Sequence, residues 1–406
     1  MLVAATGVGA GDLATASLAG AALGLAVLWA VVVGAFLKFV LNEGLTRWQL
    51  ATGTTLVEGC VARLGRPVLW LFLAYLVVWS FLVAAALMSA AGVTAHAIWP
   101  LAGQGPAAAQ TDKIIYGAIH SLVALALVIL GGYRLFEKAM AATIAVMFFT
   151  VVTTAVAISP PWDEVLRGLV LPSIPPGGAS WAVAIMGGVG GTVTVLCYGY
   201  WIREEGRDNI ADLPLCRWDL AMGYVMTAAF GLSMIVVGNS LGELEGGGAT
   251  LVVKIASQLE EVFGAAGPLA KWAFLAGAWG AVFSSMLGVW QSIPYLFADL
   301  WQLRTGRTGP IDVRSQPYRL YLYAIGTLPF LGLAAFNFQS MQKLYAIVGA
   351  LFIPMLAAVL LVLNGRSDWV GRENVNSRWT TTVLVGALVL FAAAGAIEIR
   401  DTLFPS

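Results

Sequence analysis

The feature that most constrains the fold of this chain is a series of apolar runs, each about 20 residues long. A helix of ~20 apolar residues spans the roughly 30 Å hydrocarbon core of a bilayer. The chain is 59% hydrophobic and 11% charged, with a mean hydropathy of +0.84, which is far outside the range of soluble domains. We therefore predict an all-α integral membrane protein with about eleven transmembrane helices. These lie near residues 2–22, 24–42, 68–92, 114–131, 139–158, 180–201, 218–239, 268–297, 319–336, 344–364 and 379–396.

Composition and motifs exclude several other classes of protein. Lys and Arg together number 22, as do Asp and Glu, so net charge gives no reason to expect a nucleic acid partner. The three cysteines form no CxxC pair, which argues against a disulfide framework or a zinc site. The chain has no GxSxG, HExxH, P-loop or paired-carboxylate motif, so we expect no enzyme activity and no cofactor. The apolar N-terminus, without a basic region before it, is predicted to be the first membrane helix.

The distribution of basic residues predicts the orientation of these helices. Cytoplasmic loops of membrane proteins carry an excess of Lys and Arg. With the N-terminus inside, fifteen of the 22 basic residues fall on the cytoplasmic side, six fall outside and Lys38 lies within the second helix. We therefore predict a multi-pass protein of the cell membrane with a cytoplasmic N-terminus.

Two glycine-rich segments, Gly7–Asp12 and Gly187–Thr192, interrupt the first and sixth predicted helices. A helix can unwind inside a bilayer only where its freed amides and carbonyls line a polar cavity or hold a ligand. A pair of such breaks at corresponding positions of two halves is typical of the midplane site of a transporter. We therefore predict that helices 1 and 6 are broken and that the breaks form a binding site.

Asp12 is the leading candidate in the first break. A carboxylate at membrane depth costs ~2.5 to 3.5 kcal/mol unless water, a cation or a helix end compensates it. Backbone carbonyls between Thr6 and Ala10, including that of Gly9, would be free to point at the same place. Carboxylate and carbonyl oxygens suit a hard cation. The alternative is that Asp12 caps the helix that starts near Leu13.

In the second break, the Thr194 hydroxyl and carbonyls near Gly191 are candidate ligands if the two breaks face each other. The alternative for these small residues is close packing between helices. Candidates for gating or for a proton path lie outside the breaks. They are Lys38, Glu43, Arg47 and Tyr198. Glu43 and Arg47 have the spacing of an i,i+4 ion pair, for which a structural role at the membrane interface is the alternative.

The chain resembles the Nramp family of divalent-metal transporters in residues 3–15, Ala19–Ala21, Leu28–Trp29 and Arg47–Gly53. The resemblance continues through Gly132–Glu137 and covers nearly the whole length. It implies a LeuT-like fold, in which helices 1 to 5 and 6 to 10 are inverted repeats. It also implies alternating access around a site between helices 1 and 6.

The departures from the family pattern fall on the site itself. Where typical members carry Asp-Pro-Gly-Asn, this chain has Gly9–Asp12, so Gly9 stands for the usual Asp and Asp12 for the Asn. Their Met-Pro-His-Asn aligns with Thr194–Cys197, so Thr194 replaces the soft methionine ligand, and their glutamine in helix 10 aligns with Phe352. Loss of the thioether removes the feature that favours Mn²⁺ and Fe²⁺ over Mg²⁺ and Ca²⁺.

These patterns predict secondary-active transport of a divalent cation of the Mn, Fe or Mg class, with Asp12, Thr6, Gly9, Gly191 and Thr194 as its ligands. Coupling to protons is left open. The alternatives are a LeuT-fold symporter of a small organic solute and a membrane sensor that retains the fold without transport. We expect a monomer with the lipid bilayer as its surroundings. The whole of 1–406 is expected to be one transport domain, with helices 1–5 in about 1–158, helices 6–10 in about 180–364 and helix 11 in about 379–396.

Overall fold

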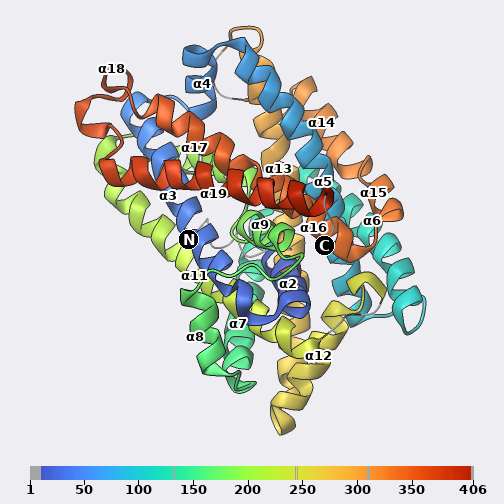
Figure 1. The fold of residues 1–406 in the computed structure, drawn as a ribbon. Helices are drawn as coiled ribbons and strands as arrows, with labels where there is room; N and C mark the ends of the chain where they lie inside the picture. The colour runs from blue at the N-terminus through green and yellow to red at the C-terminus, as the bar shows by residue number, and fades with distance from the viewer. Residues whose placement is uncertain are drawn as a thin grey trace.

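The computed structural model describes residues 11–130, 133–242, 244, 246–307, 309 and 311–403, and this part of the chain is helical without any strand (Figure 1). The first half contains α2 (Ala16–Leu23), α3 (Leu28–Thr52), α4 (Leu56–Leu64), α5 (Arg66–Ile98), α6 (Pro106–Leu130), α7 (Tyr133–Ala157) and α8 (Trp162–Val170). The second half contains α9 (Ala179–Gly188), α10 (Cys197–Glu204), α11 (Leu213–Leu241), α12 (Leu251–Val262), α13 (Gly267–Leu303), α14 (Gln316–Thr327), α15 (Phe330–Ala335), α16 (Phe338–Ala350), α17 (Phe352–Leu363), α18 (Ser367–Val370) and α19 (Arg378–Leu403).

Within the described residues, eight helical segments are long and apolar enough to cross a membrane, or up to nine if the bent pair 144–157 and α8 forms one span. This confirms the predicted all-α membrane class. The number is lower than the predicted eleven for a physical reason. The first two predicted helices fall in one segment of this count, Gly11–Thr52, because only the short turn at Gly24 separates them. The region of the ninth predicted helix, 319–336, is divided into the short helices α14 and α15 beside Pro329.

The described part of the first predicted break, Gly11 and Asp12, lies in a widened helical turn. Residues Gly11–Thr15 form one turn of π-helix, η1, which leads into α2. Gly24 then takes φ +68° at the start of a short 3₁₀ turn, η2 (Gly24–Val27), before α3 begins. A positive φ is accessible to glycine at little cost. The chain therefore changes direction between the first two membrane helices with almost no loop.

The second predicted break is present in the structure. α9 ends at Gly188, a 3₁₀ turn, η3, covers Val193–Leu196, and α10 resumes at Cys197. Gly190 and Gly191 both have φ +79°, a left-handed conformation that a side chain with a Cβ rarely adopts. The glycines are therefore what allows the helix to open here.

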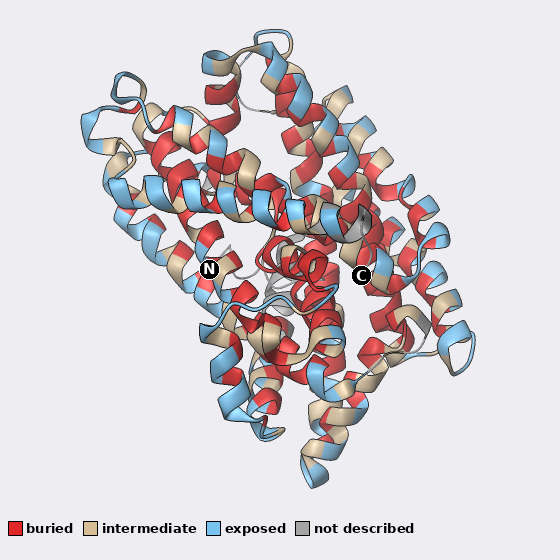
Figure 2. Ribbon diagram, in the orientation of Figure 1, coloured by how far each residue is buried: buried red, intermediate tan, exposed pale blue. Residues whose placement is uncertain are grey.

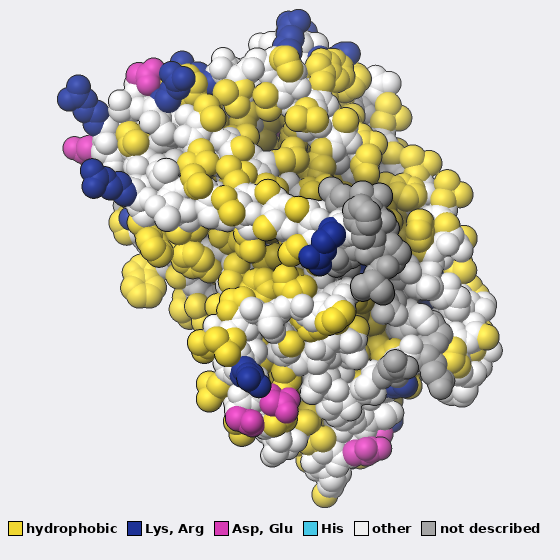
Figure 3. All heavy atoms as spheres, viewed as in Figure 1, with side chains coloured by type: hydrophobic (Ala, Val, Ile, Leu, Met, Phe, Trp, Pro, Cys, Tyr) yellow, Lys and Arg dark blue, Asp and Glu magenta, His cyan; other side chains and the backbone are white. Residues whose placement is uncertain are grey.

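Burial separates central from peripheral helices. α9 and α10 lie mostly inside the bundle, whereas α6 and α19 expose much of their apolar length. Figure 2 shows the buried residues gathered around α9, with exposed residues along α19 and the outer helices. In Figure 3, apolar side chains fill the middle of this face, and most charged side chains lie toward its ends. The exposed apolar surface is that expected of a protein surrounded by lipid.

Short helices mark the two ends of the bundle. α4 and α18 lie at one end, and α8 and α12 lie at the opposite end (Figure 1). α4 begins with a capping box, in which Thr55 accepts from the Glu58 amide and Glu58 accepts from the Thr55 amide. This arrangement matches the predicted alternation of loops between two sides.

Several helices extend beyond their predicted bounds, and the end of the second helix matters most for the site. The second helix was expected to end near residue 42, with Arg47 in a loop, but α3 continues to Thr52 and Arg47 is buried within it. Three charged residues, Lys38, Glu43 and Arg47, lower the local hydropathy and suggested an end. Because each of them has partners inside the protein, the helix continues through the bundle.

Candidate functional site

The two breaks lie directly against each other. A Cβ added to Gly11 would lie 2.1 Å from the carbonyl oxygen of Gly188, and one added to Gly188 would lie 3.3 Å from the Thr15 hydroxyl. No side chain fits at the Gly11 contact. Glycine at position 11 therefore allows η1 to touch the end of α9, as the sequence led us to expect.

Asp12 belongs to this contact. Its side chain is buried, with 1% of the residue exposed, and Oδ1 accepts a hydrogen bond of 3.2 Å from the backbone amide of Gly190. That amide is free because the helix is open at this point. The first break therefore supplies a carboxylate to an amide that the second break releases.

Lys38 supplies the complementary interaction. It lies on α3, is 1% exposed, and its Nζ donates to the carbonyl oxygens of Gly187, at 2.8 Å, and Val189. Lys38 and Asp12 thus bind neighbouring backbone groups of the same break, the carbonyls of Gly187 and Val189 and the amide of Gly190. One turn before Lys38, Gly34 brings α3 close to α9, since a Cβ there would lie 2.9 Å from the Cα of Met186. The sequence suggested Lys38 for gating or for a proton path, and its contact with the second break was not predicted.

A cavity of about 50 Å³ adjoins the breaks. Asp12, Gly191 and Thr194 line it, so the structure brings these three predicted residues together. Two lining residues that we did not predict are Trp79 of α5 and Ser285 of α13. The indole N–H of Trp79 and the hydroxyl of Ser285 are buried and have no hydrogen-bond partner. Such groups are costly to bury unless a ligand or water satisfies them.

Nothing in the sequence marks these two residues, because each lies in a long apolar helix. The neighbouring Ser284 bonds within its own helix, to the carbonyl of Ala281 at 3.0 Å. No sequence signal distinguishes Ser284 from Ser285. Ser285 lines the cavity because of the way α13 is oriented about its own axis.

The remaining predicted site residues lie elsewhere. Thr6 and Gly9 are outside the described residues. The Tyr198 side chain is fully buried, and its hydroxyl donates to Asp219 of α11 at 3.1 Å. It does not line the central cavity, whereas Trp201, one turn further along α10, does.

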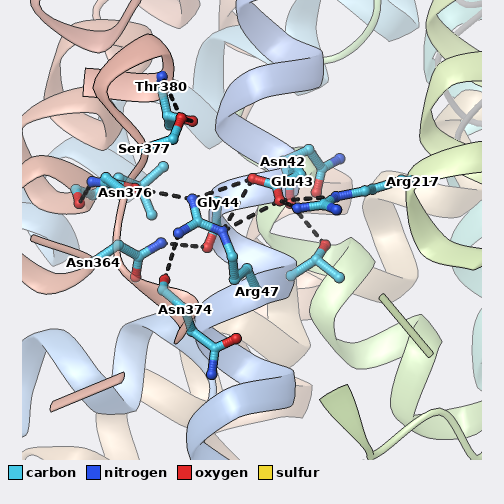
Figure 4. A network of polar contacts seen from close by, with 12 residues as sticks. Asn42, Glu43, Gly44, Arg47, Arg217, Asn364, Asn374, Asn376, Ser377 and Thr380 are labelled. Carbon is cyan, nitrogen blue, oxygen red and sulfur yellow. Dashed lines mark hydrogen bonds and ion pairs between the residues drawn. The ribbon is translucent and has the colours of Figure 1, made fainter. Parts of the chain in front are cut away.

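Glu43 and Arg47 form a polar network at one end of α3 (Figure 4). The predicted ion pair is present, with Arg47 Nε 3.3 Å from Glu43 Oε1. Glu43 also accepts from Arg217 of α11 at 2.7 Å. Arg47 donates to the Asn374 carbonyl at 2.6 Å and to the Asn376 side chain at 2.9 Å. The network therefore joins α3 to α11 and to the chain before α19.

A second, larger cavity of about 910 Å³ lies beside α4, α10 and α13. Its lining includes Glu58, Arg203, Tyr200 and Asp299. The Tyr200 hydroxyl donates to Asp299 at 2.7 Å, and Arg203 lies 3.5 Å from Glu58. Because Tyr200 faces this cavity and Trp201 faces the central one, α10 separates the two.

The two histidines are occupied in other contacts. His96 Nδ1 lies 2.7 Å from Asp112, which is buried with it. His120 lies 2.7 Å from the Tyr116 carbonyl through Nδ1 and accepts from Trp279 through Nε2 at 2.8 Å. These two contacts require a neutral His120 with the proton on Nδ1.

The described residues contain no group of three or more His, Cys, Asp or Glu side chains that could hold a metal ion. A cation at the breaks would therefore be bound by one carboxylate together with neutral oxygens. This donor set suits hard cations better than soft ones. Because the site has a single carboxylate, its affinity for a cation also depends on any other charged side chain nearby.

Comparison with solved structures supports the fold. The chain is similar to a variant of the Eremococcus coleocola manganese transporter, with a TM-score of 0.72 and 15% identity, over 100% of this chain and 87% of that one. It is also similar to MhsT in complex with L-phenylalanine, with a TM-score of 0.66 and 15% identity, over 97% and 96% of the two chains. At these identities, the likeness concerns the fold.

Sequence comparison gives the family. The chain is 25% identical over 238 residues to the divalent metal cation transporter MntH of Chromohalobacter salexigens. That alignment covers 56% of this chain and 52% of MntH, which is about half the length of the relative. The model of the family described as natural resistance-associated macrophage protein-like, Nramp, matches residues 1–399. With this match over nearly its whole length, the chain belongs to the Nramp family.

Proposed function

We propose that this protein transports a divalent metal cation across the cell membrane, toward the cytoplasm, by alternating access. The observation that carries the proposal is the buried Asp12 carboxylate, held between two facing helix breaks at the edge of a small cavity. Family membership supports the same substrate class. The names of the similar proteins, a divalent metal cation transporter and a manganese transporter, agree with it.

The ligand set that we propose contains oxygen atoms only. Asp12 provides the charge, and the Thr194 hydroxyl and the Gly191 carbonyl complete the near side, since all three residues line the cavity. Ser285 joins them because its buried hydroxyl has no other partner. Oxygen ligands without a thioether favour Mg²⁺ and Mn²⁺ over softer ions.

We propose that the larger cavity is the inner exit. It carries the carboxylates of Glu58 and Asp299, and α10 separates it from the site. The end of the bundle with α4 and α18 then faces the cytoplasm, in agreement with the basic residues near it, Arg63, Arg66 and Arg366. The N-terminus is cytoplasmic in this arrangement, and one chain contains the whole path.

The direct test is metal flux into proteoliposomes that contain the purified full chain. A panel of Mg²⁺, Mn²⁺, Fe²⁺ and Ca²⁺ is offered, and binding is measured by isothermal titration calorimetry. Asp12→Asn removes the charged ligand and is expected to abolish both binding and uptake. A matched control is Asp112→Asn, because Asp112 is also buried and also accepts from backbone amides, but lies outside the cavity lining.

The control variant is expected to keep the metal dissociation constant of the native protein even if it is less stable. Retained uptake by a folded Asp12→Asn protein contradicts the assignment of Asp12. Flux of an organic solute without any metal flux contradicts the proposed substrate class. Absence of all flux by the native chain contradicts transport itself.

A further inference from the structure

The environment of Lys38 is that of a bound cation. Its Nζ donates to the carbonyl oxygens of Gly187 and Val189, which the second break releases from helical hydrogen bonding. These oxygens lie at the carboxyl end of α9, where the helix dipole favours positive charge. A side-chain ammonium thus takes up the same kind of ligands, backbone carbonyls at a helix break, that a metal ion would use.

Lys38 also balances the charge of Asp12. Both residues are almost completely buried, and they bind neighbouring backbone groups of the second break, Asp12 the amide of Gly190 and Lys38 the carbonyls of Gly187 and Val189. A carboxylate at this depth is costly without a compensating charge, and the described residues that line the cavity include no cationic side chain. With Lys38 in place, the two charges at the breaks sum to zero.

A divalent ion and the ammonium cannot share this site without strong repulsion. Like charges a few ångströms apart repel strongly in a medium of low dielectric constant. The described residues offer no cluster of acidic side chains that could hold both cations. A metal ion that binds Asp12 must therefore be accompanied by movement of the Lys38 side chain away from the carboxylate.

We infer that Lys38 is a tethered cation, which occupies the break in the empty carrier and is displaced when metal binds. This inference depends on the proposed metal transport. It assigns Lys38 two effects. The ammonium weakens metal binding by competition, and it keeps the empty carrier electrically balanced so that the carrier can return without a second ion.

The test compares Lys38→Met with Lys113→Met in the full chain. Lys113 is a matched control, because it is also fully buried and donates to a backbone carbonyl, that of Phe336 at 2.6 Å, but lies on α6 outside the cavity. Metal affinity is measured by calorimetry in detergent. Net metal uptake into empty vesicles and metal exchange into metal-loaded vesicles are measured in proteoliposomes.

Removal of the competing charge should make metal binding at least about tenfold tighter in Lys38→Met. The empty carrier of this variant holds an unbalanced carboxylate, so the ratio of net uptake to exchange should fall by about tenfold or more. Lys113→Met should leave both quantities as in the native protein. A role of Lys38 in packing alone would lower net uptake and exchange together and would not tighten binding.

Lys38→Gln provides a second variant, because its amide can still donate hydrogen bonds but carries no charge. It should show the same tighter binding. If Asp12→Asn and Lys38→Met each lower the melting temperature, the double variant should recover most of the loss, since neither charge is then left alone.

The failures of the two proposals are distinguishable. A native chain that neither binds nor moves metal overturns metal transport. A native chain that moves metal, while folded Lys38→Met or Lys38→Gln shows unchanged affinity and an unchanged ratio of net uptake to exchange, overturns the tethered cation alone.

Discussion

The contact between Gly11 and Gly188 provides the sharpest test of how the breaks form the site. In Gly11→Ala, the added Cβ would lie 2.1 Å from the Gly188 carbonyl oxygen, whereas real Cβ atoms essentially never approach closer than 3.0 Å. The two breaks must therefore separate by about 0.9 Å, because the obstructing atom belongs to the backbone. Forced overpacking of this kind costs about 1–3 kcal/mol.

The effect on metal binding should exceed the effect on folding. Asp12 directly follows Gly11, and metal–ligand distances tolerate changes of only about 0.2 Å. A displacement of about 0.9 Å should weaken metal binding at least tenfold, equivalent to about 1.4 kcal/mol. Calorimetric titration of the purified variant measures this loss, and a thermal melt shows whether the protein is folded.

Gly386→Ala is the matched control. Gly386 lies within α19, outside the central cavity, and an added Cβ there meets nothing within 4 Å. We expect it to bind metal within about threefold of the native protein and to be slightly more stable, since alanine favours a helix by up to about 1 kcal/mol. Unchanged affinity in a folded Gly11→Ala protein would refute the view that the glycine contact sets the geometry of the site.

Two other substitutions test the remaining parts of the structure. Thr194→Met places a thioether on the cavity and should raise the preference for Mn²⁺ over Mg²⁺ in competition uptake about tenfold or more. The control Thr194→Ser should leave this preference as in the native protein. An unchanged preference in Thr194→Met would exclude position 194 from the ligand shell. Glu43→Gln removes the charge that faces the buried Arg47, and should lower the free energy of unfolding by about 2–3 kcal/mol in thermal melts. The control Glu260→Gln breaks a partly exposed ion pair with Lys271 and should lower the free energy of unfolding by less than about 1 kcal/mol. Equal losses of stability in the two variants would contradict a structural role for the Glu43 network.

Local sequence signals were sufficient for the membrane class and for the second break. Gly190 and Gly191 take backbone conformations that other residues avoid, so the conformational need is visible in the residue type itself. The ion pair of Glu43 and Arg47 was predictable for a similar reason, because helical spacing alone brings the two side chains together.

Contacts between distant helices were not predictable in the same way. Lys38 reaches the carbonyls of Gly187 and Val189 across 149 and 151 positions of the chain, and nothing beside it in sequence indicates these partners. Ser285 faces the cavity only because of the rotation of α13. The physical reason is the same in both cases, since the packing of whole helices decides which polar groups meet.

The size of the central cavity has a consequence for the hydration of the ion that we propose is transported. A cavity needs about 10–15 Å³ to hold one water molecule by the same measure, so about 50 Å³ holds roughly three to five. An ion with six waters does not fit, and part of its hydration shell must be left outside before Asp12 can bind it. Mg²⁺ releases water reluctantly. In the proposed transport, the cavity would therefore favour Mn²⁺ over Mg²⁺ through the cost of dehydration, even though its oxygen ligands would accept both ions. The cavity near Tyr200, the proposed inner exit, is far larger and has room for an ion with its full complement of water.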